Sequence, residues 1–228
     1  NINPRQLVEF AKRFGKIGYY PFVKGMTDYP EVVEVTKNEN EKINFGGLWH
    51  TDTSYLNKPP ASSILYAVEV PPIGGDTLFS NMYMAYDSLS KSYKALIRDL
   101  RAINSSEKPD AAITRVHRIA DNPKDADNIA TTSSHPIVRI HPETKKKALY
   151  CSNAHSIRID GMTHSESRGI LEYLYSVQQR EEFSCRFRWK KGSIAFWDNR
   201  AAQHNALNDY HGFKRVMYRV THEGDSPV

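Results

Sequence analysis

Short segments that favour β-strands recur along this sequence, and they limit the fold more than any other feature. Each segment is rich in β-branched or aromatic residues and is bounded by Pro, Gly, Asn or Lys-rich turns, which is the pattern of strands. We expect strands at residues 31–36, 62–70, 135–141, 147–152, 182–189, 192–198 and 214–222. The chain should therefore fold mainly as β-sheet.

Helix signals are fewer than strand signals. Pro4 and Gly15 stand at the start and the end of an apolar, periodic segment, as expected for a first helical turn and for the residue after the last turn. Asn81 can cap a second helix, and Thr163 with Glu166 forms a capping box for a third. We therefore expect a few helices beside the strands.

The composition is that of one globular domain. The chain has 228 residues, of which 39% are hydrophobic and 25% are charged, and this length favours a single domain over residues 1–228. No run approaches the roughly 18 apolar residues that cross a membrane, and no secretion signal begins the chain. We expect a cytoplasmic protein that lacks part of its N-terminus, because a helix signal follows Asn1 almost at once.

Cysteine usage and charge exclude some classes of protein. Cys151 and Cys185 lie far apart without CxxC spacing, which argues against a disulfide framework and against a thiolate zinc site. The net charge of +5 raises nucleic-acid binding as an alternative, but the basic residues are dispersed along the chain.

A long polar stretch separates two of the expected strands. Residues 104–134 are weakly periodic, and a segment of this length inside a compact domain is usually a functional loop or a disordered one. We interpret this segment as a candidate lid.

A histidine and an aspartate two positions apart form the strongest candidate site. On a strand, His50 and Asp52 would face the same side and could reach one ion, although the same pair also suits a hydrogen-bonded strand end. His204, near the expected end of a later strand, could supply a third ligand. Two histidines and one carboxylate leave positions open on Fe(II) for a co-substrate and dioxygen. Zinc fits the same ligand types.

Two arginines four residues apart near the C-terminus could bind acidic ligands. Arg215 and Arg219 would lie on one face of a strand, and a guanidinium can donate two parallel hydrogen bonds to a carboxylate such as that of 2-oxoglutarate. The alternate residues of this strand are apolar, so simple amphipathicity would send both arginines to solvent. The pattern leaves both interpretations open.

The sequence closely resembles the taurine dioxygenase and 2,4-dichlorophenoxyacetate dioxygenase family of Fe(II)/2-oxoglutarate-dependent oxygenases. The resemblance covers residues 49–90, 135–159, 187–200 and 197–225. The resemblance implies a double-stranded β-helix, or jelly roll, with helices packed outside it. It also implies a hydroxylase that uses Fe(II), 2-oxoglutarate and dioxygen and that releases succinate and carbon dioxide.

The resemblance assigns residues by motif. His50, Asp52 and His204 would bind the iron. Arg215 would bind the far carboxylate of 2-oxoglutarate together with Thr77. The remaining assignments concern the substrate, and they place Arg219 against its acidic group, with Tyr20, Tyr55, Asn153 and His155 as further contacts.

Departures from the family pattern bear on the substrate. Tyr20 stands where taurine enzymes have a histidine that helps to bind the sulfonate, and His155 replaces an apolar aromatic residue. We expect a small acidic substrate and poor activity on taurine. We expect no nucleic-acid or membrane partner and allow for a homo-oligomer. The alternatives are a nucleic-acid-modifying oxygenase with the same cofactors and a non-catalytic jelly-roll binding protein.

Overall fold

The computed structural model describes residues 2–20, 23–113 and 131–228. The strands are β1 (Ile17–Gly18), β2 (Val33–Lys37), β3 (Ser62–Glu69), β4 (Thr77–Asn81), β5 (Arg101–Ser105), β6 (Thr132–Pro136), β7 (Val138–Ile140), β8 (Lys147–Leu149), β9 (Ser156–Ile159), β10 (Ser184–Phe187), β11 (Ile194–Asp198), β12 (Ala202–Ala206) and β13 (Arg215–His222). The helices are α1 (Pro4–Ala11), α2 (Met82–Asp87), α3 (Lys91–Ile97), α4 (Pro109–Ala112) and α6 (His164–Gln178), with short 3-10 turns at Lys12–Phe14 and Glu181–Phe183. The expectation of a mainly β fold with flanking helices is confirmed.

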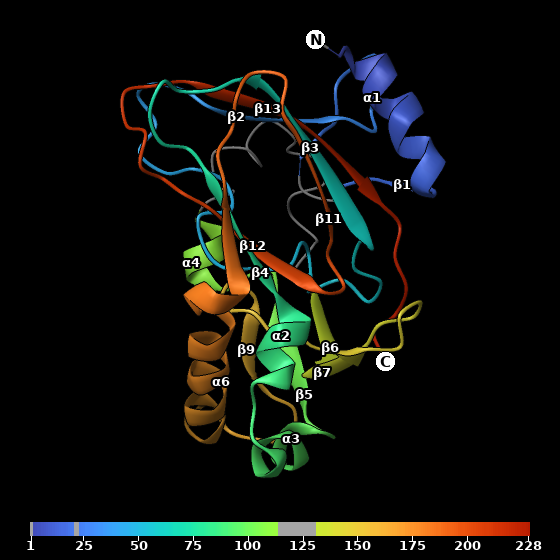
Figure 1. Ribbon diagram of the computed structural model, residues 1–228, viewed down its shortest axis with the longest axis vertical. Coiled ribbons are helices and arrows are strands. Elements are labelled where there is room, and N and C mark those ends of the chain that lie inside the picture. The colour runs from blue at the N-terminus through green and yellow to red at the C-terminus, as the bar shows by residue number, and fades with distance from the viewer. Residues whose placement is uncertain (1, 21–22, 114–130) are drawn as a thin grey trace.

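Two antiparallel sheets form the part of the fold that carries the site. The larger sheet has the order β1-β13-β3-β11, with β2 also paired to β13, and the smaller sheet has the order β10-β4-β12. Figure 1 shows β3, β11 and β13 on one side of the molecule and β4 with β12 beside them. A small apolar cluster that includes Trp189, Trp197 and Met217 packs next to these strands.

Helix α1 covers the outer side of the larger sheet. Its side chains Leu7, Val8 and Ala11 are buried against Ile64 and Val220 of the sheet, and Figure 1 shows α1 beside β1 and β3. Because α1 screens this side from water, strand β13 is covered on both faces. Because both faces are covered, the alternating apolar pattern of β13 does not place its two arginines in solvent.

The other helices gather at the opposite end of the molecule (Figure 1). Helices α2 and α6 and the residues around α3 enclose a second apolar core together with β5, β7, β8 and β9. Asn81 accepts hydrogen bonds from the amides of Tyr83 and Met84, and Thr163 with Glu166 forms the expected capping box. Both expected helix starts are therefore confirmed.

Several boundaries differ from the sequence expectations. The expected strand 135–141 is divided into β6 and β7, and the first helix ends at Ala11 before a 3-10 turn. Strands β4, β5, β9 and β12 and helix α3 were not expected. These strands have at most five residues each, and they are held by pairing with distant partners, which a local pattern does not show.

The segment that we interpreted as a lid is partly regular in its described residues. Residues 104 and 105 belong to β5, residues 132–134 belong to β6, and these two strands pair with each other. The expected loop is therefore shorter at both ends than 104–134. Residues 114–130 lie outside the described residues, so the lid interpretation stays a prediction. None of the helices in the described part of the chain has the length and apolar character that a membrane span requires.

Candidate active site

The two expected histidine ligands lie opposite each other on neighbouring backbones. His204 is the central residue of β12, and His50 forms an isolated antiparallel bridge with it. The His50 amide donates to the His204 carbonyl at 3.0 Å, and the His204 amide donates back at 2.9 Å. Asp52 lies in a turn, so the expectation that His50 and Asp52 share a strand is wrong. A single bridge and the turn bring the two side chains together instead.

The three expected ligands converge on one point, which we call the metal site. Nε2 of His50 lies 3.7 Å from Oδ1 of Asp52, and Nε2 of His204 lies 3.9 Å from the same oxygen. One ligand atom from each residue lies within 4.8 Å of the others, and all three side chains are buried. Two imidazoles and one carboxylate suit Fe(II) and leave positions open for other ligands. The residues present therefore fit the metal that the resemblance implies.

The His50 imidazole is prepared to bind a cation through Nε2, and the His204 imidazole is kept neutral. Nδ1 of His50 lies 2.6 Å from the carbonyl oxygen of Leu48, and because a carbonyl only accepts, Nδ1 carries the proton and Nε2 keeps its lone pair. Burial, followed by the proximity of His50, lowers the pKa of His204 to about 3. Gly46 permits this close packing, because a Cβ there would lie 3.1 Å from Cε1 of His50.

A chain of hydrogen bonds orients the carboxylate of Asp52. Ser63 Oγ donates to Asp52 Oδ2 at 2.6 Å and accepts from Nδ2 of Asn199 at 2.9 Å. Nε1 of Trp197 donates to Oδ1 of Asn199 at 2.9 Å. Burial opposes ionisation of Asp52, but the charge of Arg219, followed by the contact with His50, holds the pKa of Asp52 well below its usual range. Asp52 is therefore a fixed anion whose Oδ1 faces the metal site.

Arg215 lies at one end of the cavity beside the metal site, and we call this region the co-substrate end. The cavity is lined by Thr77, His204 and Arg215, among others. Trp189 donates from Nε1 to Oγ1 of Thr77 at 3.0 Å, and the Arg215 guanidinium lies 5.6 Å from the Trp189 ring. Burial lowers the pKa of Arg215, and a side-chain hydrogen bond with Tyr210 opposes that change. Among the described residues, Nε and Nη2 of Arg215 are buried without a partner.

Arg219 lies on the same strand and is equally buried. Its Nη1 lies 3.5 Å from Oδ1 of Asp52, and its guanidinium stacks 4.4 Å from the ring of Tyr20 and 5.5 Å from that of Phe45. In the described part of the chain, nothing accepts a hydrogen bond from Nε or Nη2 of Arg219. The solvent-facing interpretation of both arginines is therefore wrong.

A pocket that we call the substrate pocket joins the metal site to most of the expected substrate contacts. It is lined by Tyr20, Tyr55, His155 and Arg219, among others. The His155 ring lies 5.0 Å from that of Tyr55 and 6.0 Å from that of His50. Asn153 does not line this pocket. Its side chain is exposed because it lies in a turn whose next residues face inward instead.

Some residues of the site were not predicted from the sequence. Ser63 faces inward from β3, and Trp189 and Tyr210 pack against Thr77 and Arg215. Ser63 could have been found from its place on the same strand face as Leu65 and Ala67, where a polar residue interrupts apolar ones. Trp189 and Tyr210 carry no local signal that would link them to Arg215.

Known proteins resemble this chain in family, in sequence and in structure. The family model "Taurine catabolism dioxygenase TauD, TfdA family" matches residues 1–221. An alpha-ketoglutarate-dependent sulfonate dioxygenase of Saccharomyces cerevisiae is 32% identical over 99% of this chain, and a sulfate ester dioxygenase of Pseudomonas putida with the same co-substrate is 32% identical over 96%. Alpha-ketoglutarate is another name for 2-oxoglutarate.

Solved structures agree with the sequence relatives. A taurine dioxygenase from Burkholderia xenovorans matches with a TM-score of 0.81 and 35% identity, over 99% of this chain and 74% of that one. This match confirms the expected jelly-roll fold. The chain spans 56% of the length of the Saccharomyces relative and 72% of the Pseudomonas relative.

Proposed function

The chain belongs to the taurine catabolism dioxygenase TauD, TfdA family, and from this premise we propose that it is an Fe(II)- and 2-oxoglutarate-dependent dioxygenase. One oxygen atom of dioxygen would enter a substrate C–H bond as a hydroxyl group, and the other would enter succinate as 2-oxoglutarate loses carbon dioxide. When bound, Fe(II) and 2-oxoglutarate supply the activation of dioxygen. The observation that carries the proposal is that His50 and Arg219 line both pockets, so one continuous site reaches from Arg215 to the substrate pocket.

The chain's own residues divide the binding work. His50, Asp52 and His204 would hold the metal through Nε2, Oδ1 and Nε2. Arg215 would take the far carboxylate of 2-oxoglutarate with its Nε and Nη2 donors, which have no partner in the described chain. Thr77 accepts from Trp189, so its hydroxyl hydrogen remains to donate to the same carboxylate.

Arg219 would hold an acidic group of the substrate. Asp52 faces Nη1 of this guanidinium, but Nε and Nη2 are buried without a partner in the described chain, and buried donors without an acceptor cost free energy. Its stacking on Tyr20 fixes the plane of the guanidinium, which favours a planar or tetrahedral oxyanion in one orientation. The acidic group would therefore orient the substrate so that one C–H bond lies next to the metal site.

The class of substrate that we propose is a small sulfonate, sulfate ester or carboxylate. The relatives named above are a sulfonate dioxygenase and a sulfate ester dioxygenase, and all three acidic groups suit Arg219. Tyr20, Tyr55 and His155 give the pocket polar edges that a longer or more polar substrate than taurine would use. We expect poor activity on taurine.

A substrate screen tests this proposal. Purified protein with Fe(II), 2-oxoglutarate and oxygen would be offered a library of small acids, with succinate formation measured and corrected for turnover without substrate. Wild type and Arg219→Ala would be compared, with Arg13→Ala as a control because Arg13 is exposed. Efficient taurine hydroxylation would remove the specificity claim. Equal hydroxylation of a neutral best substrate by wild type and Arg219→Ala would remove the role of Arg219.

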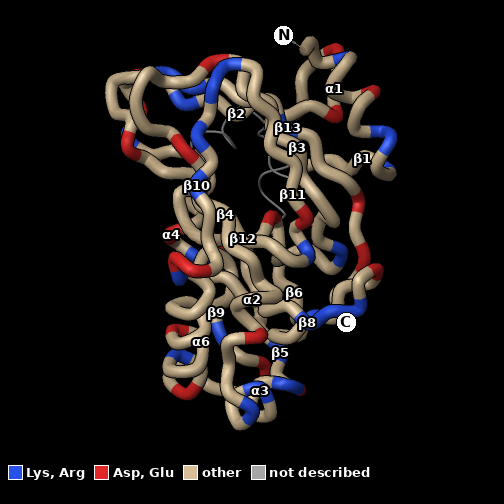
Figure 2. Tube along the Cα trace, viewed as in Figure 1, with Lys and Arg blue, Asp and Glu red and all other residues tan. Residues whose placement is uncertain are grey.

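The alternatives gain no support from the described residues. The non-catalytic interpretation requires a broken ligand set or a missing arginine, whereas His50, Asp52 and His204 converge and Arg215 is buried beside them. Figure 2 shows basic and acidic residues interspersed along the trace in this view, whereas a nucleic-acid groove gathers basic residues. Salt-dependent binding of an oligonucleotide to the purified protein would reopen the nucleic-acid alternative.

A further inference from the structure

Lys37, the last residue of β2, is a buried lysine outside the ligand set described above. Only 2% of its surface is exposed, and its ammonium has no hydrogen-bond partner among the described residues. The ammonium lies 4.4 Å from the centre of the Tyr210 ring, which is the geometry of a cation–π contact. Lysine is seldom buried this completely without a paired anion.

The pairing of β2 with β13 places Lys37 directly across from Arg215. Opposed residues in an antiparallel pair point to the same face, and like charges at such positions destabilise the sheet. Asp76, a nearby carboxylate that favours the charged form of Arg215, is held by Arg186 at 2.7 Å. This part of the sheet therefore carries two buried cations, and no carboxylate of the described chain pairs directly with either of them.

Tyr210 connects the two cations. Its side chain is buried, it forms a side-chain hydrogen bond with Arg215, and its ring carries the Lys37 ammonium. Gly75 closes the other side, because a Cβ there would lie 3.3 Å from the Tyr210 ring and 3.4 Å from Cδ of Arg215. A shift of Tyr210 would therefore move Arg215.

We propose that Lys37 is a positioning residue for the co-substrate, which holds Tyr210 and through it Arg215, and whose charge strengthens binding of a 2-oxo acid that carries a distal carboxylate. The inference rests on the proposed use of 2-oxoglutarate. Lys37 does not line the cavity that contains Arg215, so its charge acts across the buried tyrosine, where a low dielectric weakens it less than water would. The second cation favours dianionic 2-oxoglutarate over 2-oxo acids with a single carboxylate.

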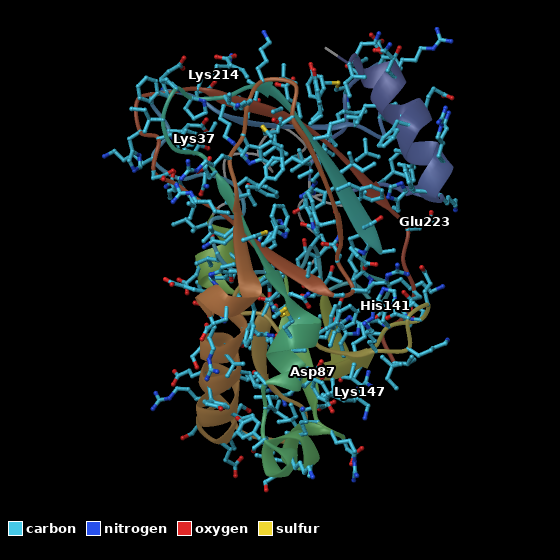
Figure 3. All side chains as sticks on the ribbon, viewed as in Figure 1. Lys37, Asp87, His141, Lys147, Lys214 and Glu223 are labelled. Atoms are coloured by element: carbon cyan, nitrogen blue, oxygen red, sulfur yellow. The ribbon has the colours of Figure 1, made fainter. Side chains whose placement is uncertain are left out.

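Binding titrations without oxygen test the inference on the metal-loaded protein. Calorimetry would measure the affinity for 2-oxoglutarate and for 2-oxobutyrate, which has no distal carboxylate. Lys37→Met removes the charge at nearly constant volume and should weaken 2-oxoglutarate binding about tenfold. The same change should leave the affinity for 2-oxobutyrate within about twofold of wild type. Lys214→Met is the matched control, because Lys214 is partly exposed and lies at the same end of the molecule (Figure 3).

A double-mutant cycle separates the route through Tyr210 from a general loss of structure. Tyr210→Phe keeps the ring beneath the ammonium and removes the hydroxyl that meets Arg215. If Lys37 acts through Tyr210, the two changes together should weaken binding by less than the product of their single effects. A thermal unfolding curve for each variant shows whether it is folded.

The outcomes distinguish this inference from the proposed function. If wild type binds neither acid, the proposed function fails. If wild type binds 2-oxoglutarate and folded Lys37→Met binds it with equal affinity, the inference fails and the function stands. The inference also fails if Lys37→Met weakens the binding of 2-oxobutyrate as much as the binding of 2-oxoglutarate. If Lys37→Met does not fold, Tyr210→Phe decides, and an unchanged affinity for 2-oxoglutarate in that variant overturns the inference.

Discussion

The metal site and the co-substrate end share one cavity but differ in how far the protein satisfies their hydrogen bonds. At the metal site, two of the three residues have protein partners on the side that faces away from the ion: Nδ1 of His50 meets a backbone carbonyl, and Oδ2 of Asp52 accepts from Ser63. Nδ1 of His204 is buried without a partner in the described chain, so this ligand is positioned by its backbone bridge to His50. At the co-substrate end, Arg215 keeps two buried donors without a partner in the described chain. The protein itself therefore fixes most of the first region, whereas the second would be completed by the ligand that we propose.

This difference predicts how each region responds to substitution. An unpaired buried charge costs several kcal/mol, so Arg215, which has no ion-pair partner in the described chain, should reduce the stability of the ligand-free protein and gain most when an anion binds. The two histidine ligands are held by hydrogen bonds between their backbones, and the Asp52 carboxylate is stabilised by the charge of Arg219. Removing one of them should therefore affect function far more than folding.

The largest expected effect follows from His204→Ala. The variant should lose turnover entirely while keeping its fold, because the backbone bridge between residues 50 and 204 does not use the imidazole. The measurement is the weak visible band that Fe(II) and 2-oxoglutarate give without oxygen, with thermal unfolding recorded in parallel. His211→Ala, at an exposed histidine, is the control. A band of unchanged strength in His204→Ala would show that the ligand set is wrong.

Arg215→Ala should have the next largest effect. Loss of the guanidinium leaves a buried carboxylate unpaired and should weaken 2-oxoglutarate binding by about 2–5 kcal/mol, with only partial rescue by lysine. In the absence of ligands the same variant should be at least as stable as wild type, which is the opposite of the usual result for a buried residue. The measurements are KM for 2-oxoglutarate and Tm, with Arg188→Ala at an exposed position as control. Identical kinetics in Arg215→Ala and wild type would remove this assignment.

Ser63→Ala tests the support of the metal site with a smaller expected loss. Ser63 donates to the oxygen of Asp52 that turns away from the metal, and removal of such an outer contact typically costs about 10–100-fold in metal affinity or activity. Metal affinity would be measured by competition with a chelator, and Ser92→Ala in the exposed part of α3 serves as control. If metal binding is unaffected, the hydrogen bonds behind Asp52 do not orient it.

The smallest effects should separate the two regions. Trp197 donates towards the metal site through Asn199, and Trp189 donates to Thr77 at the co-substrate end. Each Trp→Phe change removes one hydrogen bond worth about 0.5–1.5 kcal/mol. Trp197→Phe should weaken metal binding more than co-substrate binding, and Trp189→Phe should do the reverse. The same pattern of losses in both variants would contradict the division of the cavity.

The sequence predicts the local parts of this molecule well. Asn81 and Thr163 cap their helices as expected, since a cap depends on residues three positions away. The residue types suggested His50, Asp52 and His204 as metal ligands and the resemblance assigned them, and the three side chains converge although His50 and Asp52 share no strand. The resemblance pointed to Arg215 and Arg219. Their burial depends on α1 and on the partner strands that cover β13.

The remaining features depend on contacts between distant residues. Lys37 and Arg215 become neighbours only when β2 pairs with β13, and Ser63 meets Asn199 across 136 positions of sequence. Asn153 is exposed and does not line the substrate pocket, because one residue in a turn decides whether a side chain faces a pocket or solvent. No periodicity within one segment carries that information.

Strand β13 carries both Arg215 and Arg219, four positions apart. A strand rises about 3.3 Å per residue, so the two Cα atoms stand about 13 Å apart on a backbone paired on both sides. The proposed anchor points of co-substrate and substrate therefore have a constant separation. Under the proposed function, the carbon that is oxidised would be selected by the number of bonds between it and the acidic group. In a homologous series of acids, regiochemistry would follow chain position and not the intrinsic strength of each C–H bond.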